Sequence, residues 1–144
     1  GQGCHSEGDE VTLHVQSARI NYSGPERLDV TRKSGTDGLF LAPSWKILRP
    51  ALAGIARARL LAGAGLYFDA SCIESDAWAD YVPAYLAEMR RSYVDNRAAW
   101  TALLSLERVV LCCYCTDPEH YHRALLRARI LPALGATDCG ELAA

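Results

Sequence analysis

The sequence predicts a Rossmann-like α/β domain of three layers, in which a mainly parallel sheet is flanked by helices. Three observations support this class. The chain opens with short strand patterns, helical patterns fill its middle, and a long apolar strand runs directly into a helix near its end. That strand, RVVLCCYC (residues 108–115), is apolar on both alternating faces, as is typical of a central parallel strand buried by helices.

The composition is that of one globular domain. The chain has 144 residues, of which 50% are hydrophobic and 22% are charged. A chain of this length can bury a hydrophobic core without cross-links or a second domain. The opening GQGCHSEGDE is polar and rich in glycine. We therefore predict a disordered tail over residues 1–10 and a single α/β domain over residues 11–144.

Charge, hydropathy and cysteine content exclude several classes of protein. The longest apolar stretch, residues 51–68, is interrupted by Arg57 and Arg59, so no membrane span is predicted. The net charge of −2 lacks the positive field of duplex-DNA binders. Three of the six cysteines crowd into one apolar run and no secretory signal precedes them, which indicates reduced thiols in a cytoplasmic protein.

Two strands are predicted to begin the domain. VTLHVQSARI (residues 11–20) alternates apolar Val11, Leu13 and Val15 with polar residues, the period of a strand with one covered face. RLDVTRKSG (residues 27–35) predicts a second short strand. The turn-forming residues after it predict a loop that leaves the end of this strand.

Two helices are predicted next. Ser44 is a suitable N-cap for a short helix that starts at Trp45. Pro50 must break or restart that helix, because proline lacks the amide that a helix interior uses. The second helix then runs from Pro50 to Ala62 and ends at Gly63, a residue suited to a left-handed C-terminal position.

The following segment is predicted to lead into a core helix. LYFDASCI (residues 66–73) indicates a brief strand or an extended loop, and Asp76 is expected to cap the helix after it. That helix carries an apolar stripe at four-residue spacing, which is typical of core packing. The stripe consists of Tyr81, Tyr85 and Met89, with Trp78 and Leu86 nearby.

Two further helices complete the prediction. Asp95 or Asn96 is expected to start a helix that buries Trp100, together with Leu103 and Leu104. The last helix is predicted from Pro118 to about Leu134, before Gly135.

The end of the buried strand is the predicted site. Ligands of parallel sheets bind beyond the carboxyl ends of the strands, which is where Cys115, Thr116 and Asp117 fall. Asp117 precedes Pro118, a pair that is expected to start the last helix. The amides and dipole of a helix start favour an anion and lower the pKa of a nearby thiol. A phosphate or a thiolate therefore suits this position.

His122 and Arg123 have two interpretations. In the functional one, the imidazole is an acid or base beside an arginine that clamps an anion. In the structural one, His122 is bonded to the backbone of a neighbouring strand and Arg123 is anchored to loop carbonyls. Cys112 and Cys113 are interpreted as small core residues.

A metal site is a further hypothesis, because CYC and HYH look like paired ligands. Cys113 and Cys115 share one face of a strand, whereas His120 and His122 would be rotated by about 200° from each other on a helix. Zinc sites usually have four ligands, and the spacing here is not that of a finger or ribbon. A site would therefore use Cys113, Cys115 and one histidine.

These residues also resemble those of a known family. LCCYCTDPEHYHRALLRARILPALGA resembles domain-of-unknown-function family 488, in which a buried strand ends in cysteine and a Cys-His-Arg triplet opens the next helix. QSARI, LDVTRKSG, LFLAPSW, YLAEMRRSY, AAW and GEL follow in the family's order, so the resemblance covers residues 13–142. Tyr121 stands where the family usually has the cysteine of its triplet, which leaves Cys115 as the candidate thiol.

The resemblance implies a pocket but no reaction. Carried over by position, its residues are Ser17, Arg19, Thr31, Lys33, Ser34, Pro43, Ser44, Trp45, Cys115, His122, Arg123 and Glu141.

The leading hypothesis is an enzyme that acts on a small phosphorylated or nucleotide-like ligand. Arg123, Lys33 and the helix start would bind its anionic group, while His122 or Cys115 performs proton transfer or nucleophilic chemistry. The second hypothesis is a non-catalytic module that binds nucleic acid or a partner protein through the arginines of the last helix: Arg123, Arg127 and Arg129. The metal-binding protein is the third. No cofactor and no oligomeric state follow from the sequence.

Overall fold

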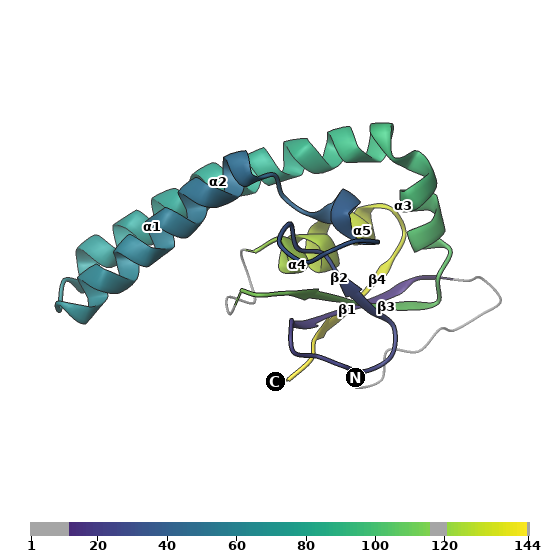
Figure 1. Ribbon diagram of the computed structural model, residues 1–144, viewed down its shortest axis with the longest axis horizontal. Helices are drawn as coiled ribbons and strands as arrows, with labels where there is room; N and C mark the ends of the chain where they lie inside the picture. The colour runs from purple at the N-terminus through teal and green to yellow at the C-terminus, as the bar shows by residue number, and fades with distance from the viewer. Residues whose placement is uncertain (1–11, 116–120, 144) are drawn as a thin grey trace. The chain divides into compact units, whose positions relative to one another are not determined.

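The computed structural model describes residues 12–115 and 121–143 (Figure 1). The predicted tail, and the predicted roles of Thr116, Asp117, Pro118 and His120, lie outside these residues. The strands are β1 (His14–Arg19), β2 (Arg27–Asp29), β3 (Arg108–Cys113) and β4 (Thr137–Glu141). The long helices are α1 (Trp45–Gly63), α2 (Tyr67–Asp95) and α3 (Arg97–Leu104). The short segments are η1 (Leu39–Leu41), α4 (His122–Leu125), the π-helical η2 (Leu126–Ile130) and α5 (Leu131–Ala133).

Within the described residues, four strands form one sheet in the order β2-β3-β1-β4, and every neighbouring pair is parallel. This all-parallel sheet with its helices confirms the predicted α/β class and is consistent with a three-layer domain. β3 is central, as predicted from its apolar composition. Five of its six residues are buried, from Val109 to Cys113.

The two faces of the sheet are covered differently. α4, η2 and α5 form one continuous helical stretch on one face (Figure 1), where α4 contacts β1 and β3. On the opposite face Ala18, Val110 and Cys112 form a small buried cluster. Ile20, Tyr22 and Leu142 pack against that cluster from the segments that follow β1 and β4.

The chain divides into two compact units. One consists of residues 1–42 and 90–144 and contains the sheet; the other, residues 43–89, consists of α1 and most of α2. In this second unit α1 and α2 form a helical hairpin (Figure 1). The expectation that residues 11–144 form a single domain stays a prediction.

Aromatic side chains form much of the helical core, as predicted. The stripe Tyr81, Tyr85 and Met89 is buried on α2, and the rings of Tyr81 and Tyr85 stack 5.8 Å apart. α3 begins after Asn96, as predicted, and buries Trp100 completely.

The prediction that Pro50 breaks a helix is wrong. α1 runs without interruption from Trp45 to Gly63 with Pro50 inside it. The missing amide would have bonded the carbonyl of Lys46, which lies in the first turn, so only one bond near the helix start is lost. The helix continues past Pro50 because it buries Ala51, Ile55 and Ala58.

The interpretation of residues 66–73 as a strand or loop is also wrong, because residues 67–73 form the start of α2. Gly65, with φ of +83°, turns the chain after α1, and Asp69 places a carboxylate in the first turn of α2, where the helix dipole favours it. Asp76 therefore lies inside the helix and does not cap it.

The last helix starts later than predicted. Tyr121 is extended, with φ of −73° and ψ of 165°, so α4 starts at His122 and not at Pro118. The polar segment TDCGE after it forms β4, a strand that the sequence did not predict. Within the described residues, no helix combines the length and apolar character that a membrane span needs.

Candidate functional site

The carboxyl ends of the strands meet at one edge, because all four strands are parallel. Cys113 ends β3 and pairs in register with Arg19 at the end of β1. Asp29 ends β2, and Glu141 ends β4 and pairs with Ser17 of β1. Most of the predicted residues of the first compact unit therefore cluster along this edge, in two hydrogen-bonded groups.

The first group is centred on Arg123. Its guanidinium is completely buried and forms a two-pronged ion pair with Glu141: Nε donates to Oε1 at 3.0 Å and Nη2 to Oε2 at 2.6 Å. Nη1 donates to the thiol sulfur of Cys113 at 3.1 Å and to the backbone carbonyl of Cys115. Although burial opposes the charged form, the hydrogen bonds that Arg123 donates to Glu141 raise the pKa of Arg123 above its usual value, so it stays charged.

Ser17 and Arg127 extend this group along β1 and β4. The Ser17 hydroxyl, fully buried, donates to Glu141 Oε1 at 2.6 Å and accepts from Arg127 Nε at 2.9 Å. Arg127 also pairs with Asp138 Oδ1 at 2.5 Å. Partial burial acts to raise the pKa of Glu141, but the hydrogen bonds from Arg123 and Ser17 outweigh it and lower that pKa.

A bulge in β4 makes this pairing possible. His14 and Val15 pair with Thr137 and Asp138, but Ser17 pairs with Glu141, so β4 contains one extra residue there. Gly140, within the bulge, has φ of +84°, a backbone conformation that residues other than glycine adopt only at a cost in free energy. The extra residue brings the Glu141 carboxylate opposite Ser17.

The thiols near the strand end differ in exposure. Cys112 and Cys113 are buried, as predicted for core residues, and burial raises the pKa of the Cys112 thiol to about 11. Burial likewise raises the pKa of Cys113, despite the opposing effect of Arg123. Cys115 is half-buried, and the bond from Arg123 holds its carbonyl. Cys72, Cys112, Cys113 and Cys115 are free thiols, whereas Cys139 is disulfide-bonded, so the prediction of reduced thiols is wrong for Cys139.

His122 lies in the interior, with 4% of its surface exposed. Burial lowers the pKa of its imidazole to about 4, against the opposing effect of a hydrogen bond to the backbone of Val30. The ring is therefore neutral at neutral pH. Val30 directly follows β2, so this contact matches the structural interpretation of His122.

The second group lies at the end of β2. Asp29 accepts hydrogen bonds from the Thr31 hydroxyl at 2.6 Å and the Ser34 hydroxyl at 2.5 Å. Tyr114, which follows β3, donates its hydroxyl to Ser34 Oγ at 2.8 Å. The ammonium of Lys33 lies over the Tyr114 ring, 5.2 Å from its centroid. Lys33, Ser34 and Tyr114 are exposed, so this group presents a cation and two hydroxyls to solvent.

Two glycines shape the loop that carries this group. A Cβ on Gly35 would lie 2.5 Å from the Thr31 carbonyl oxygen, and one on Gly38 would lie 2.3 Å from that of Asp29. The loop therefore folds tightly over the end of β2. Although partial burial acts to raise the pKa of Asp29, the hydrogen bonds from Ser34 and Thr31 lower it, which keeps the carboxylate ionised.

The predicted site residues are thus partly brought together. Ser17, Cys115, Arg123 and Glu141 share the first group, and Thr31, Lys33 and Ser34 share the second. Arg19 is exposed at the end of β1. Pro43, Ser44 and Trp45 belong to the helical unit, where Ser44 donates its amide to Glu88 Oε1 at 2.8 Å and its hydroxyl to Glu88 Oε2.

Sequence reasoning missed Asp29 and Tyr114. Asp29 sits in LDVT with Thr31 two residues after it, the spacing at which a carboxylate bonds the chain that follows. That signal was present in the sequence. The sequence carries no such signal for Tyr114, because its hydrogen bond to Ser34 joins two segments that are far apart in the chain.

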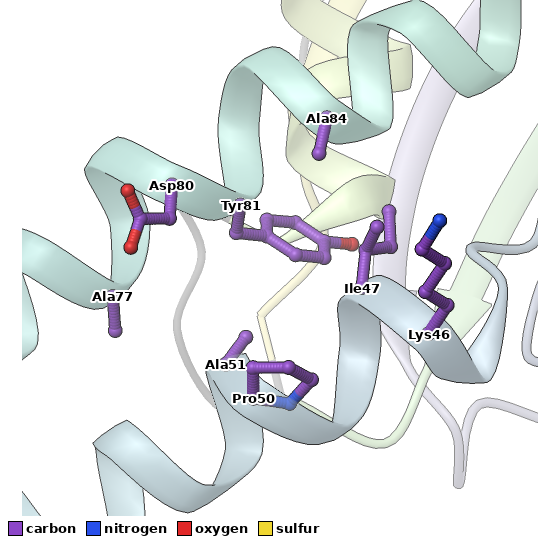
Figure 2. Close-up of a pocket in the computed structure, with 8 residues that line it drawn as sticks. All are labelled: Lys46, Ile47, Pro50, Ala51, Ala77, Asp80, Tyr81 and Ala84. Atoms are coloured by element: carbon purple, nitrogen blue, oxygen red, sulfur yellow. The ribbon is translucent and has the colours of Figure 1, made fainter.

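Two features lie apart from these groups. No cluster of three metal-binding side chains occurs within the described residues. A groove of about 200 Å³ lies between α1 and α2 of the helical hairpin (Figure 2). Lys46, Ile47 and Pro50 line it from α1, and Ala77, Asp80 and Tyr81 from α2. None of the predicted site residues lines this groove.

The fold and site define a class of protein: a parallel α/β domain in which a half-buried cysteine follows the central strand and a buried arginine holds its backbone. Residues 40–133 match the family DUF488-N3a, described as the active DUF488-N3 subclade. The chain belongs to this family, which confirms the resemblance found in the sequence. No curated protein and no solved structure matches the chain.

Proposed function

We propose that this protein is an enzyme that acts on a small phosphorylated or nucleotide-like ligand, bound at the carboxyl ends of β2 and β3. The observation that carries the proposal is the position of Cys115. It follows the central strand, it is half-buried, and its carbonyl is held by the buried guanidinium of Arg123. Binding beyond the carboxyl ends of parallel strands is general for such sheets. The description of the family as an active subclade supports a reaction.

Cys115 is the proposed nucleophile. The neighbouring thiols, Cys112 and Cys113, are buried and have raised pKa values, so they stay protonated and unreactive. Cys115 reaches solvent in part and emerges where substrates of parallel sheets bind. Its thiolate would attack the phosphorus of the ligand and form a sulfur–phosphorus bond, while the bond from phosphorus to the leaving oxygen breaks and that oxygen takes a proton from water. Water would then hydrolyse the sulfur–phosphorus bond, which releases phosphate and restores the thiolate.

Lys33, Ser34 and Tyr114 are the proposed ligand-binding residues. Lys33 supplies a positive charge for an anionic group, and the two hydroxyls supply hydrogen bonds beside it. The fully buried Arg123 is already occupied by Glu141, Cys113 and Cys115, so we assign it a positioning role in place of direct anion binding. His122 has the same role, because it is held against Val30.

The nucleic-acid hypothesis receives less support. Of the three arginines on which it rests, Arg123 is buried and Arg127 is paired with Asp138 and Ser17. Arg129 alone of the three is exposed. A binding surface for phosphates needs several free cations, so one exposed arginine is insufficient.

The experiment combines thiol reactivity with a search for products. A Cys72→Ser background removes the exposed thiol outside the site. In this background, limited iodoacetamide should modify Cys115 well before Cys112 and Cys113, as measured by peptide mass spectrometry. Incubation with nucleoside mono-, di- and triphosphates, followed by chromatography with mass detection, should reveal a product that is lost in Cys115→Ser without loss of helicity.

A matched pair of variants tests the assignment of the ligand-binding residues. Lys33→Ala should weaken binding of the same phosphorylated compound at least tenfold in calorimetry, whereas Arg129→Ala, which removes an exposed cation elsewhere, should leave it unchanged. Equal effects of the two variants would contradict the site. Iodoacetamide modification of all three thiols at one rate would contradict the assignment of Cys115.

A further inference from the structure

The two helices of the hairpin carry opposite charge. α1 contains basic residues and no acidic ones, whereas the part of α2 in this unit, residues 67–89, contains acidic residues and no basic ones. The basic set is Lys46, Arg49, Arg57 and Arg59, and the acidic set is Asp69, Glu74, Asp76, Asp80 and Glu88. Within the described residues, no ion pair joins these two sets.

Part of each set faces the same side of the hairpin. Lys46 and Asp80 both line the groove between α1 and α2, one from each helix (Figure 2). Arg57 lies three helical turns after Lys46, so it lies on the same side of α1. Asp76 lies one turn before Asp80, on the same side of α2, and both carboxylates are exposed. The groove is therefore bordered by a basic edge and an acidic edge.

The groove itself is apolar and built from small residues. Ile47, Pro50, Ala51, Ala77 and Ala84 line it together with the Tyr81 ring. The helices pack closely at Gly54, where an added Cβ would lie 2.9 Å from that of Ala77. A pair of helices that pack this closely leaves a shallow apolar surface on its open side. Further helices commonly cover such a surface in bundles.

We propose that this face of the hairpin binds the same face of a second copy of the chain, forming a four-helix bundle. A two-fold axis parallel to the helices places α1 of each copy beside α2 of the other. The basic edge of one copy then meets the acidic edge of its partner, and the reverse contact forms by symmetry. Around the bundle, each helix neighbours only helices of the opposite charge.

The level of the charged residues fits this arrangement. Gly54 and Ala77 lie level with each other, and Arg57 and Asp76 both lie toward the hairpin turn from them. At about 1.5 Å per residue, Arg57 and Asp76 differ in height by roughly 3 Å, within reach of an arginine side chain. The same axis brings both hairpin turns to one end, where Leu60, Tyr67 and Phe68 are 76%, 71% and 80% exposed.

A second copy fits the charges better than nucleic acid or a lipid surface. The basic edge of α1 alone would suit a phosphate backbone or an anionic membrane. The acidic edge across the same groove would repel both, since charged surfaces must match in sign over the whole contact. A partner that presents an acidic edge and a basic edge in the right order is available in the chain itself.

Charge reversal tests the proposal in the full-length protein. Analytical ultracentrifugation should give a dimer, twice the 15.7 kDa mass of the chain. Lys46→Glu/Arg57→Glu should make α1 acidic on this face, so that α1 of each copy repels the acidic edge of α2 in the other copy. Asp76→Lys/Asp80→Lys should have the converse effect. Each variant alone should be monomeric, with the helix content of the wild type in circular dichroism.

Mixing the two variants provides the decisive measurement. The acidic α1 of the first then faces the basic α2 of the second, and the unchanged α2 and α1 also attract, so an equimolar mixture should restore a dimer of mixed composition. Arg90→Glu/Arg91→Glu, the same change of charge on exposed residues outside the hairpin unit, should leave the wild-type dimer intact.

Three results would overturn the proposal. A wild-type monomer at every protein concentration would do so, and vesicle or nucleic-acid binding by that monomer would identify the occupant of the face. A dimer that both reversed variants retain would place the interface elsewhere. Monomeric variants that keep their helix content but do not associate on mixing would exclude pairing of α1 with α2 across the interface.

Discussion

At the scale of single residues, Arg123 organises the strand ends. Its buried guanidinium bonds the side chain of Glu141 on β4, the thiol of Cys113 on β3 and the carbonyl of Cys115 beyond β3. A buried charge is tolerated only when partners satisfy it, and here the partners come from two separate segments of the chain, residues 113–115 and Glu141. The residue therefore sets the backbone position of the proposed nucleophile.

Removing one partner of this ion pair should be costly. Glu141→Gln leaves the buried Arg123 charge without its carboxylate, which typically costs about 3–5 kcal/mol of unfolding free energy. Arg123→Lys should also destabilise, because an ammonium cannot make the two-pronged contact. Urea unfolding measures both effects. Additive losses in the double variant would contradict the coupling, whereas a double variant scarcely worse than Glu141→Gln supports it.

The buried imidazole of His122 predicts a dependence of stability on pH. Its pKa is about 4 in the folded protein and near 6.5 in an exposed state. Between these values the unfolded chain binds a proton that the folded protein does not, so the free energy of unfolding should fall as the pH falls from 6.5 to 4. The loss amounts to at most about 3 kcal/mol.

Urea unfolding of the wild type and His122→Gln at several pH values in this range tests the prediction. The variant should lose most of the slope. Asp29 and Glu141 affect the free energy of unfolding at lower pH. Their pKa values in the folded protein lie below the ordinary values of 3.8 and 4.5, so the stability that each carboxylate contributes is lost as the pH falls through the lowered pKa. Identical slopes in wild type and variant would show that another group is responsible.

At the scale of elements, the bulge in β4 decides what the last strand contributes. β4 is polar and half-exposed, and it forms a strand through its pairing with β1. Its extra residue at the bulge puts Glu141 opposite Ser17, from where the carboxylate reaches Arg123. A strand of the same composition without the bulge would present a different residue to the site.

Gly140→Ala should therefore destabilise the protein. The positive φ of Gly140 costs a side-chain-bearing residue about 1–3 kcal/mol. Gly63→Ala is the matched control, because that helical glycine has open space around its Cβ and a gain of up to about 1 kcal/mol is expected there. Thermal unfolding compares the two. A Gly140→Ala protein as stable as the control would show that the bulge tolerates other residues.

At the scale of the whole molecule, the chain joins two units of different construction. One is a parallel sheet with the strand-end groups, and the other is a helical hairpin of residues 43–89 with oppositely charged helices. The proposed chemistry belongs to the first and the proposed self-association to the second. The variants expected to abolish each function lie in its own unit: Cys115→Ser and Lys33→Ala in the first, and the charge reversals at residues 46, 57, 76 and 80 in the second. Failure of one proposal therefore leaves the other standing.

The sequence by itself determined the elements whose signal is local. The apolar run of β3 predicted a central strand, and the spacing of Tyr81, Tyr85 and Met89 predicted a buried helix face, because burial imposes a period on nearby residues. The order of short motifs along the chain predicted the family, which residues 40–133 confirm. Arg123 and Glu141 were predicted as pocket residues, although only from the resemblance.

Tertiary structure decided what depends on distant segments. β4 became a strand by pairing with β1, Pro50 stayed inside α1 because packing outweighs one lost bond, and residues 67–73 joined α2 despite their modest helix propensity. Arg123 is an anchoring residue because the fold places Glu141 of β4 beside its guanidinium, a contact that the sequence alone does not show. Such contacts leave no periodicity in the sequence, because the free energy that favours them comes from pairs of residues that meet only after folding.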